Sequence, residues 1–190
     1  MTDRVLSSRR IVEGWFDLLD LRLSLGGEEV DRYLVDHPSG SAVLAYDPDR
    51  RVATVIRQSR AALLHVGAEP LDEAVAGVAD DEDFAETARR EAREEVGLRL
   101  RDLEAVGRVW MTPSSTTERV HLFLAAYLPA ERVAEGGGLA EEHERLDVRE
   151  VPLAELWRQA EREMVDAKTL MLLQALRIRR PELFGESASR

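Results

Sequence analysis

The sequence predicts an α+β fold in which strands and a few helices form an α/β/α sandwich. Residues 19–25 alternate leucine with polar residues, which is the period of a half-buried strand. Residues 83–97 have the caps and apolar spacing of a helix, and residues 120–128 are apolar enough for a central strand. With 190 residues, 44% of them apolar, the chain can form one packed domain with a small appendage.

The first 38 residues are expected to form a small N-terminal β-strand subdomain. Strands are predicted at residues 16–25 and 30–36, with Gly26 and Gly27 in a hairpin-like turn between them. A main domain would follow from residue 39 to residue 184. Residues 185–190 are a polar tail that we expect to be mobile.

The main domain is expected to mix strands and helices. Strands are predicted at residues 41–46, 51–58, 71–76, 103–111, 120–128 and 148–151. The turn residues 47–50 join the first two of these strands. Two further helices are predicted at residues 153–165 and 167–179, separated near Asp166.

The helix at residues 83–97 carries clustered carboxylates. Asp83 suits its N-cap and Gly97 its C′ position. Glu91, Glu94 and Glu95 are three and four residues apart and therefore share one face. Like charges on one face destabilise a helix unless cations bind there, and hard ions such as Mg²⁺ take oxygen ligands. The cluster indicates a divalent-metal site, with an ordinary charged helix surface as the alternative.

Residues 77–98 resemble the Nudix box, whose pattern is G-x5-E-x7-R-E-U-x-E-E-x-G-U, where U is aliphatic. From Glu82 onward every position of the pattern is matched. Gly77, however, lies one residue too close to Arg90, so Ala76 occupies the position of the first glycine. The same shortening occurs in the GDP-mannose pyrophosphatase branch of the Nudix hydrolases, which is related to the ADP-ribose pyrophosphatases.

Other segments resemble the same branch in the same order along the chain. They are residues 56–60 (I-R-Q-S-R), 73–77 (E-A-V-A-G), 111–118 (M-T-P-S-S-T-T-E), 136–148 (from G-G-G to E-R-L-D-V) and 166–169 (D-A-K-T). Six motifs in order argue against a chance resemblance. The resemblance implies the mixed sheet of the Nudix sandwich. It also implies a homodimer in which residues 1–38 are exchanged, so that each active site draws on both chains.

The function implied by the resemblance is hydrolysis of the pyrophosphate bond of a nucleoside diphosphate sugar of the GDP-mannose kind. Mg²⁺, or alternatively Mn²⁺, would be the cofactor, and the products would be a nucleoside monophosphate and a sugar 1-phosphate. One alternative is the same chemistry on ADP-ribose, giving AMP and ribose 5-phosphate. An alternative of another class is a Nudix-fold ligand sensor without turnover, against which the complete carboxylate cluster argues.

By resemblance, the metal ligands are Glu91, Glu95 and the main-chain carbonyl of Ala76. Divalent metals can make a phosphorus electrophilic, position a water and neutralise charge. Glu94 would join a second metal or support the first. Arg90, four residues before Glu94, can hold that carboxylate in place.

The loop after the triple glycine at residues 136–138 is expected to supply one more functional glutamate. By resemblance, Glu144 binds metal or acts as the general base, which would make Glu144, Glu94 and Arg90 the catalytic set. Glu142 is the runner-up for this role, because this loop is about two residues longer than that of the branch. The three glycines would make the loop flexible enough to close.

Five residues are candidates for substrate binding. Arg60 matches the family arginine that meets the phosphates, and Glu118 matches an acidic residue on the substrate side. Trp15, followed by Phe16, lies where the branch stacks an aromatic ring on the base, with simple packing as the alternative. Arg32 is what remains of a basic strand. Lys168 is the only lysine among 26 basic residues, and it falls where the branch uses lysine.

Composition limits the other possibilities. A net charge of −11 argues against binding nucleic acid through its phosphates. The absence of cysteine excludes disulfides and thiol chemistry. No apolar segment suggests secretion or is long enough to span a membrane, so a soluble cytoplasmic protein is expected.

Overall fold

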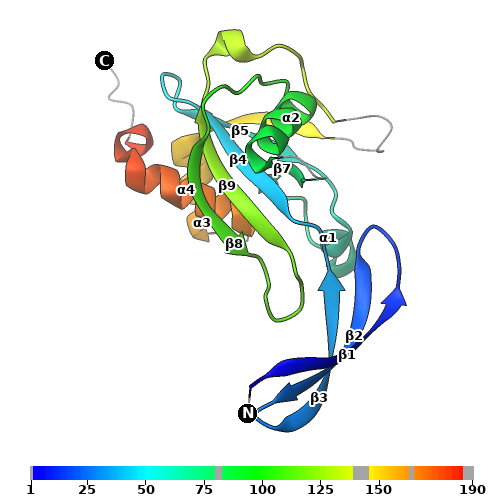
Figure 1. Cartoon of the computed structure of the whole chain (residues 1–190). Helices are drawn as coiled ribbons and strands as arrows, with labels where there is room; N and C mark the ends of the chain where they lie inside the picture. The colour runs from blue at the N-terminus through cyan, green and yellow to red at the C-terminus, as the bar shows by residue number, and fades with distance from the viewer. Residues whose placement is uncertain (1, 80–82, 139–145, 163–164, 186–190) are drawn as a thin grey trace.

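The computed structural model describes residues 2–79, 83–138, 146–162 and 165–185. At the N-terminus, three antiparallel strands form a separate sheet in the order β1 (Arg4–Val12), β2 (Asp17–Leu25) and β3 (Glu28–Asp36). Figure 1 shows this sheet projecting away from the rest of the molecule. The predicted N-terminal subdomain is thus a separate element, but it contains one strand more than the sequence indicated.

The main sheet has seven strands and is mixed, as the Nudix resemblance implied. Its order is β10-β5-β4-β9-β8, with β6 paired to β5 and β7 paired to β4. The bounds are β4 (Gly40–Asp47), β5 (Val52–Arg57), β6 (Asp72–Glu73), β7 (Val75–Val78), β8 (Glu104–Trp110), β9 (Arg119–Ala126) and β10 (Asp147–Pro152). The pair β4–β9 is parallel, whereas the other pairs are antiparallel.

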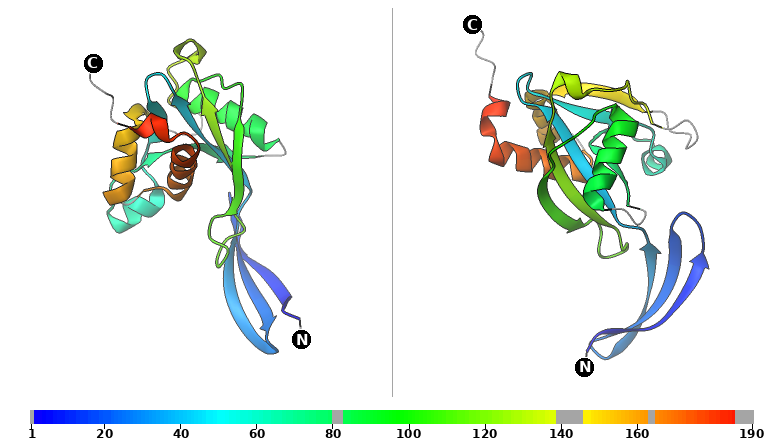
Figure 2. Two further views of the ribbon diagram at one scale, coloured as in Figure 1. Left: turned by 90° about the vertical axis from the view of Figure 1, so that its left-hand side faces the viewer. Right: turned by 45° about the horizontal axis from the view of Figure 1, so that its top comes forward.

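Helices cover both faces of the main sheet. The α-helices are α1 (Ala61–Val66), α2 (Phe84–Val96), α3 (Leu153–Arg162) and α4 (Ala167–Arg179), with short 3-10 turns at Pro129–Glu131 and Pro181–Phe184. Figure 2 shows α2 on one face and the pair α3 and α4 on the other. Alternating residues of β4 explain this arrangement, because Val43 and Ala45 pack with the α2 side whereas Ala42 and Leu44 pack with α3 and α4.

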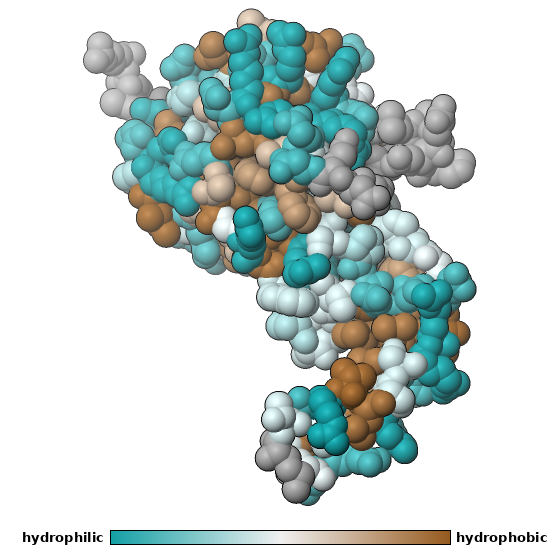
Figure 3. All heavy atoms as spheres, viewed as in Figure 1, coloured by the Kyte–Doolittle hydropathy of each residue, from teal (hydrophilic) through white to brown (hydrophobic). Residues whose placement is uncertain are grey.

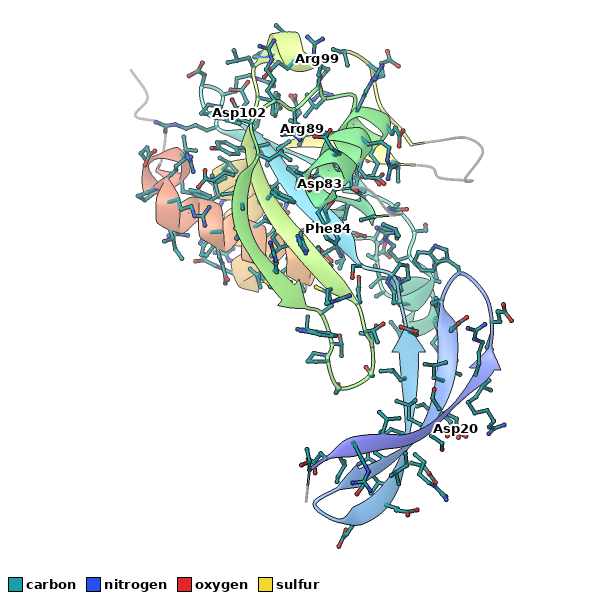
Figure 4. All side chains as sticks on the ribbon, viewed as in Figure 1. Asp20, Asp83, Phe84, Arg89, Arg99 and Asp102 are labelled. Atoms are coloured by element: carbon teal, nitrogen blue, oxygen red, sulfur yellow. The ribbon has the colours of Figure 1, made fainter. Side chains whose placement is uncertain are left out.

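The helix predicted at residues 83–97 has the expected ends. The Asp83 side chain accepts a hydrogen bond from the backbone nitrogen of Ala85, at 2.9 Å, and so caps the helix. Gly97 ends it in the left-handed region, with φ at 69°. Figure 4 labels Asp83 and Phe84 where α2 begins, and Arg89 farther along it.

The predicted strand at residues 71–76 is divided in the structure. β6 pairs with β5 and β7 pairs with β4, and the chain changes partner at Ala74. The backbone nitrogen of Ala74 donates to the Thr169 hydroxyl at 2.7 Å, instead of continuing a ladder. The sequence pattern could not reveal a change of partner, because the pairing depends on strands distant in the chain.

Two elements were missed from the sequence. β1 is exposed at every residue and shows no apolar alternation, and α1 has no buried residue. Neither carries the periodic apolar face by which strands and helices are recognised. No helix in the described part of the chain is long and apolar enough to cross a membrane. The tail predicted at residues 185–190 lies, apart from Gly185, outside the described residues.

Candidate active site

A cleft of about 850 Å³ lies among α1, β7, α2, the start of β9 and the start of α4. Figure 1 shows α2 and β7 close together, with α1 near the base of the N-terminal sheet. The cleft brings together eight of the predicted site residues, namely Trp15, Arg60, Ala76, Arg90, Glu91, Glu95, Glu118 and Lys168. Residues up to 153 positions apart in the chain therefore line one cleft.

Glu91 lies on the floor of the cleft against β7. A Cβ atom added to Gly77 would overlap the Glu91 carboxylate, so only glycine at this position lets the side chain reach the sheet. Arg90 holds the same carboxylate, with Nη1 2.9 Å from Oε1 of Glu91. Gly77 therefore has a packing role of its own, although it is displaced by one residue from the pattern of the Nudix box.

The three helix carboxylates have different surroundings. Glu95 is buried, with 3% of its surface exposed, and it lines the cleft beside Glu91. Glu94 is not among the residues that line the cleft, and its carboxylate lies 3.1 Å from Nη1 of Arg90. The predicted pair of Arg90 with Glu94 is thus present. Helical spacing placed the carboxylates on one face but could not show which of them the cleft would bury.

Arg60 is fixed by Glu73, a residue that sequence reasoning did not assign to the site. Nε of Arg60 donates to one oxygen of Glu73 at 3.0 Å, and Nη2 donates to the other at 2.8 Å. Burial lowers the pKa of Arg60, but the hydrogen bonds and charge of Glu73, followed by the charges of Glu95 and Asp166, outweigh burial and raise that pKa. The guanidinium is therefore a permanent cation with a fixed orientation.

Lys168 reaches the cleft from the first turn of α4. Its Nζ lies 2.7 Å from Oδ1 of Asp166, and 18% of the lysine side chain is exposed. The other oxygen of Asp166 caps α4 by accepting from the nitrogen and the hydroxyl of Thr169. Burial raises the pKa of Asp166, but Lys168 and these hydrogen bonds outweigh it and lower that pKa. Sequence reasoning missed Asp166, although it belongs to the motif that singled out Lys168.

Trp15 stands at the mouth of the cleft and is 70% exposed. Its ring meets the ring of His37 edge to face, with 4.8 Å between the centroids. Nδ1 of His37 lies 2.7 Å from the carbonyl oxygen of Pro38, which can only accept, so Nδ1 carries the proton. The aromatic pair is open to solvent on the side of Trp15, and the base-stacking role of Trp15 stays a prediction.

Some predicted residues lie elsewhere. Arg32 is exposed on β3, donates to the carbonyl oxygen of Asp31, and does not line this cleft. Glu144 and its runner-up Glu142 lie outside the described residues. Within the described ranges, no three acidic or histidine side chains converge closely enough to hold a metal ion by themselves. The roles of these residues remain predictions.

The triple glycine wraps the C-terminal end of α2. All three residues have positive φ, at 79°, 116° and 80°. The nitrogen of Gly137 donates to the carbonyl oxygen of Glu95 at 2.7 Å, and a Cβ on Gly136 would press on the same carbonyl. Glycine is therefore required here by backbone conformation and close approach, in addition to any role in flexibility.

These features define a class of protein. The NUDIX domain family profile matches residues 36–173, and the chain belongs to that family. It is a Nudix pyrophosphohydrolase, and two carboxylates of the Nudix box, Glu91 and Glu95, line its cleft. The predicted family, fold and enzyme class are confirmed.

Relatives extend the match over most of the chain. A GDP-mannose pyrophosphatase of Cronobacter sakazakii is 37% identical over 186 residues, which is 93% of either chain. A protein of the same name from Klebsiella pneumoniae is 32% identical over 180 residues, 90% of either chain. A solved structure titled as an ADP compounds hydrolase covers 96% of both chains with a TM-score of 0.76 and 20% identity, which supports the fold.

Proposed function

We propose that this Nudix hydrolase cleaves the pyrophosphate bond of a nucleoside diphosphate sugar and releases a nucleoside monophosphate and a sugar 1-phosphate. Mg²⁺ would be its cofactor, with Mn²⁺ as a possible substitute. Relatives named GDP-mannose pyrophosphatase, up to 37% identical over most of the chain, support a GDP-mannose-like substrate.

The charge of the cleft is the observation that carries the proposal. Its described lining holds five carboxylates (Glu73, Glu91, Glu95, Glu118 and Asp166) but three basic side chains (Arg60, Arg90 and Lys168). Each cation is already ion-paired with a carboxylate. A diphosphate is itself anionic, so the protein alone repels it and further cations are needed. Hard divalent ions with oxygen ligands meet this need.

The donor set fits such an ion. Glu91, Glu95, the carbonyl of Ala76 and Glu144 would hold it, all through oxygen atoms. The bound ion would neutralise the phosphate oxygens and make the phosphorus more electrophilic. Arg90 orients Glu91, and Glu144 or Glu142 would take the proton from the attacking water as general base.

The remaining cleft residues suit the other parts of the substrate. Arg60, oriented by Glu73, would meet the phosphates, and Lys168 would contact a negatively charged part of the substrate beside them. Glu118 would accept hydrogen bonds from sugar hydroxyls. Trp15 would stack on the base.

A homodimer is part of the proposal, because the N-terminal sheet exposes apolar side chains. Val5, Ile11, Val12, Phe16 and Tyr33 are all exposed there. Figure 3 shows hydrophobic side chains on this sheet among hydrophilic ones. Exposed apolar patches of this kind mark interaction sites. In the proposed dimer, Arg32 would bind substrate in the cleft of the second chain.

The test is a panel of nucleotide sugars and ADP-ribose, assayed for nucleoside monophosphate with Mg²⁺, with Mn²⁺ and with EDTA. We expect the highest kcat/KM for a nucleoside diphosphate sugar and no turnover with EDTA. A preference for ADP-ribose would favour the alternative substrate. Binding without hydrolysis of any compound would favour a sensor and overturn the proposal.

A further inference from the structure

Ser41, on β4, is a buried polar residue of the cleft to which the proposed function gives no role. It is 1% exposed and lines the cleft together with Gly77, Glu91 and Glu95. Its hydroxyl has no hydrogen-bond partner among the described residues. Buried hydroxyl groups are nearly always hydrogen-bonded, so this one requires a partner other than the described side chains and backbone groups.

The strand register places Ser41 beside Glu91. Ser41 pairs with Gly77 across the antiparallel β4–β7 ladder, where paired residues direct their side chains to the same face, about 4.5–5.5 Å apart between Cα atoms. The Glu91 carboxylate lies on Gly77 where a Cβ would be. The hydroxyl and the carboxylate therefore lie at the same position on one face of the sheet, without a direct hydrogen bond between them.

The size of the site does not require serine. The next two positions on this face of β4, Val43 and Ala45, are apolar, fully buried and packed with α2. An alanine at position 41 would occupy less space and would avoid burying an unpaired hydroxyl. The hydroxyl is therefore a cost to the folded chain that has to be offset by a contact formed at the site.

We propose that Ser41 is a positioning residue for the metal centre. Its hydroxyl binds one ordered water that bridges to the Glu91 carboxylate, and this bridge holds the carboxylate in the orientation that binds a divalent cation. The inference rests on the proposed metal dependence. It adds a side chain from the sheet to a centre otherwise supplied by α2, the carbonyl of Ala76 and the loop glutamate.

The test measures metal binding directly. Mn²⁺ is titrated into the wild-type protein, Ser41→Ala, Ser41→Thr and a control, Ser24→Ala, and binding is followed by electron paramagnetic resonance. Thermal unfolding without metal is recorded for each. Ser24 is a matched control because it is also a buried serine on a strand, but it lies in the N-terminal sheet.

We expect Ser41→Ala to weaken Mn²⁺ binding about tenfold, as the loss of an outer partner of a metal ligand does. Without metal, its unfolding temperature should be equal to or above that of the wild type. Ser41→Thr, which keeps the hydroxyl, should bind more tightly than Ser41→Ala, and Ser24→Ala should bind as the wild type does.

Unchanged Mn²⁺ affinity in Ser41→Ala would overturn the inference, even if KM rose, because the hydroxyl would then serve the substrate. Weaker binding together with a lower metal-free unfolding temperature would also overturn it, since alanine would have disturbed the fold. A wild-type protein that binds no Mn²⁺ would overturn the metal dependence itself, which is a different result from a difference between variants.

Discussion

The two sheets of this molecule bury their strands to opposite extents. Every residue of β4, in the main sheet, is buried, whereas every residue of β1, in the N-terminal sheet, is exposed. The main sheet is covered by α2 on one face and by α3 and α4 on the other. Three strands without such a cover have little buried apolar surface to stabilise them. In the proposed homodimer, contacts with the second chain would stabilise the N-terminal sheet.

The two sheets are joined through the loop that precedes Glu118. The nitrogen of Val35 donates to the carbonyl oxygen of Ser115, and the nitrogen of Thr117 donates back to Val35. The Thr117 hydroxyl also donates to the Asp36 carboxylate at 2.7 Å. The main domain thus supplies the buried carboxylates of the cleft, while the junction with the exposed sheet places Trp15 and Glu118 beside them.

The largest expected effect is a loss of activity on substitution of a buried carboxylate in the cleft of the main domain. Glu95→Gln removes one charge from the proposed metal centre and should lower kcat by roughly a hundred- to a thousandfold. Glu86→Gln, on the same helix but mostly exposed and paired with Arg89, should leave kcat unchanged. Steady-state assays at saturating Mg²⁺ decide this. Near-wild-type kcat for Glu95→Gln would refute the assignment of the metal ligand.

The exposed sheet is tested by a pair of identical substitutions. Ile11, on β1, is 43% exposed, and Ile178, on α4, is 80% exposed. If the N-terminal sheet is the dimer interface, Ile11→Asp buries an unpaired charge there and should weaken the dimer roughly a hundredfold, or about 3 kcal/mol. Ile178→Asp should have no such effect. Light scattering over a dilution series measures both.

A monomeric wild-type protein at micromolar concentration would remove this explanation of the exposed sheet. Equal weakening by both aspartates would instead place the interface elsewhere.

Substitution of Lys168 tests whether this side chain contacts the substrate. Lys168→Ala should raise KM about ten- to a hundredfold with kcat nearly unchanged, because a charge-assisted hydrogen bond worth roughly 1.5–3 kcal/mol is lost equally in the ground and transition states. Lys168→Arg should restore binding only in part, since a planar fork cannot replace a point charge. An unchanged KM would leave Lys168 as the partner of Asp166 only. A fall in kcat alone would place it in the chemical step.

The sequence predicted the helices and strands that carry apolar residues at regular spacing, and the segments that match a family motif. The capped helix at residues 83–97 and the grouping of Arg60, Glu91 and Lys168 in one cleft were both anticipated. β1 was not, because an exposed strand leaves no apolar alternation to recognise. Where the strand changes partner, the backbone nitrogen of Ala74 donates to the hydroxyl of Thr169, 95 positions away, and no local pattern encodes this contact.

Within the site, the sequence could name residues but not their surroundings. The partner of Arg60 is Glu73, and the partner of Lys168 is Asp166; both belong to the matched motifs, but only the folded chain shows the pairs. Ser41 matches no motif, and it acquires significance through its burial and its register with Gly77. These properties depend on how β4 and β7 pair, which the sequence does not specify by itself.

The smallest effect concerns ion pairs in the two regions. Hydrogen bonds from Arg50, together with those from Arg132 and Tyr127, outweigh burial and lower the pKa of Glu150 from its ordinary 4.5 to about 2. The carboxylate therefore stabilises the folded chain fully above pH 4.5, and this stabilisation is lost as the pH falls from 4.5 toward 2. Water reaches Glu150 and screens it, so we expect about 1 kcal/mol or less.

Glu150→Gln should lower the free energy of unfolding at pH 7 and reduce its fall between pH 4.5 and pH 2. Asp20→Asn is the control from the exposed sheet, where Asp20, labelled in Figure 4, accepts a hydrogen bond from Arg9 at 2.7 Å. The arginine is 75% exposed, so this pair should contribute almost nothing. Urea unfolding at several pH values measures both variants. Equal effects would mean that the network around Glu150 is no stronger than an exposed surface pair.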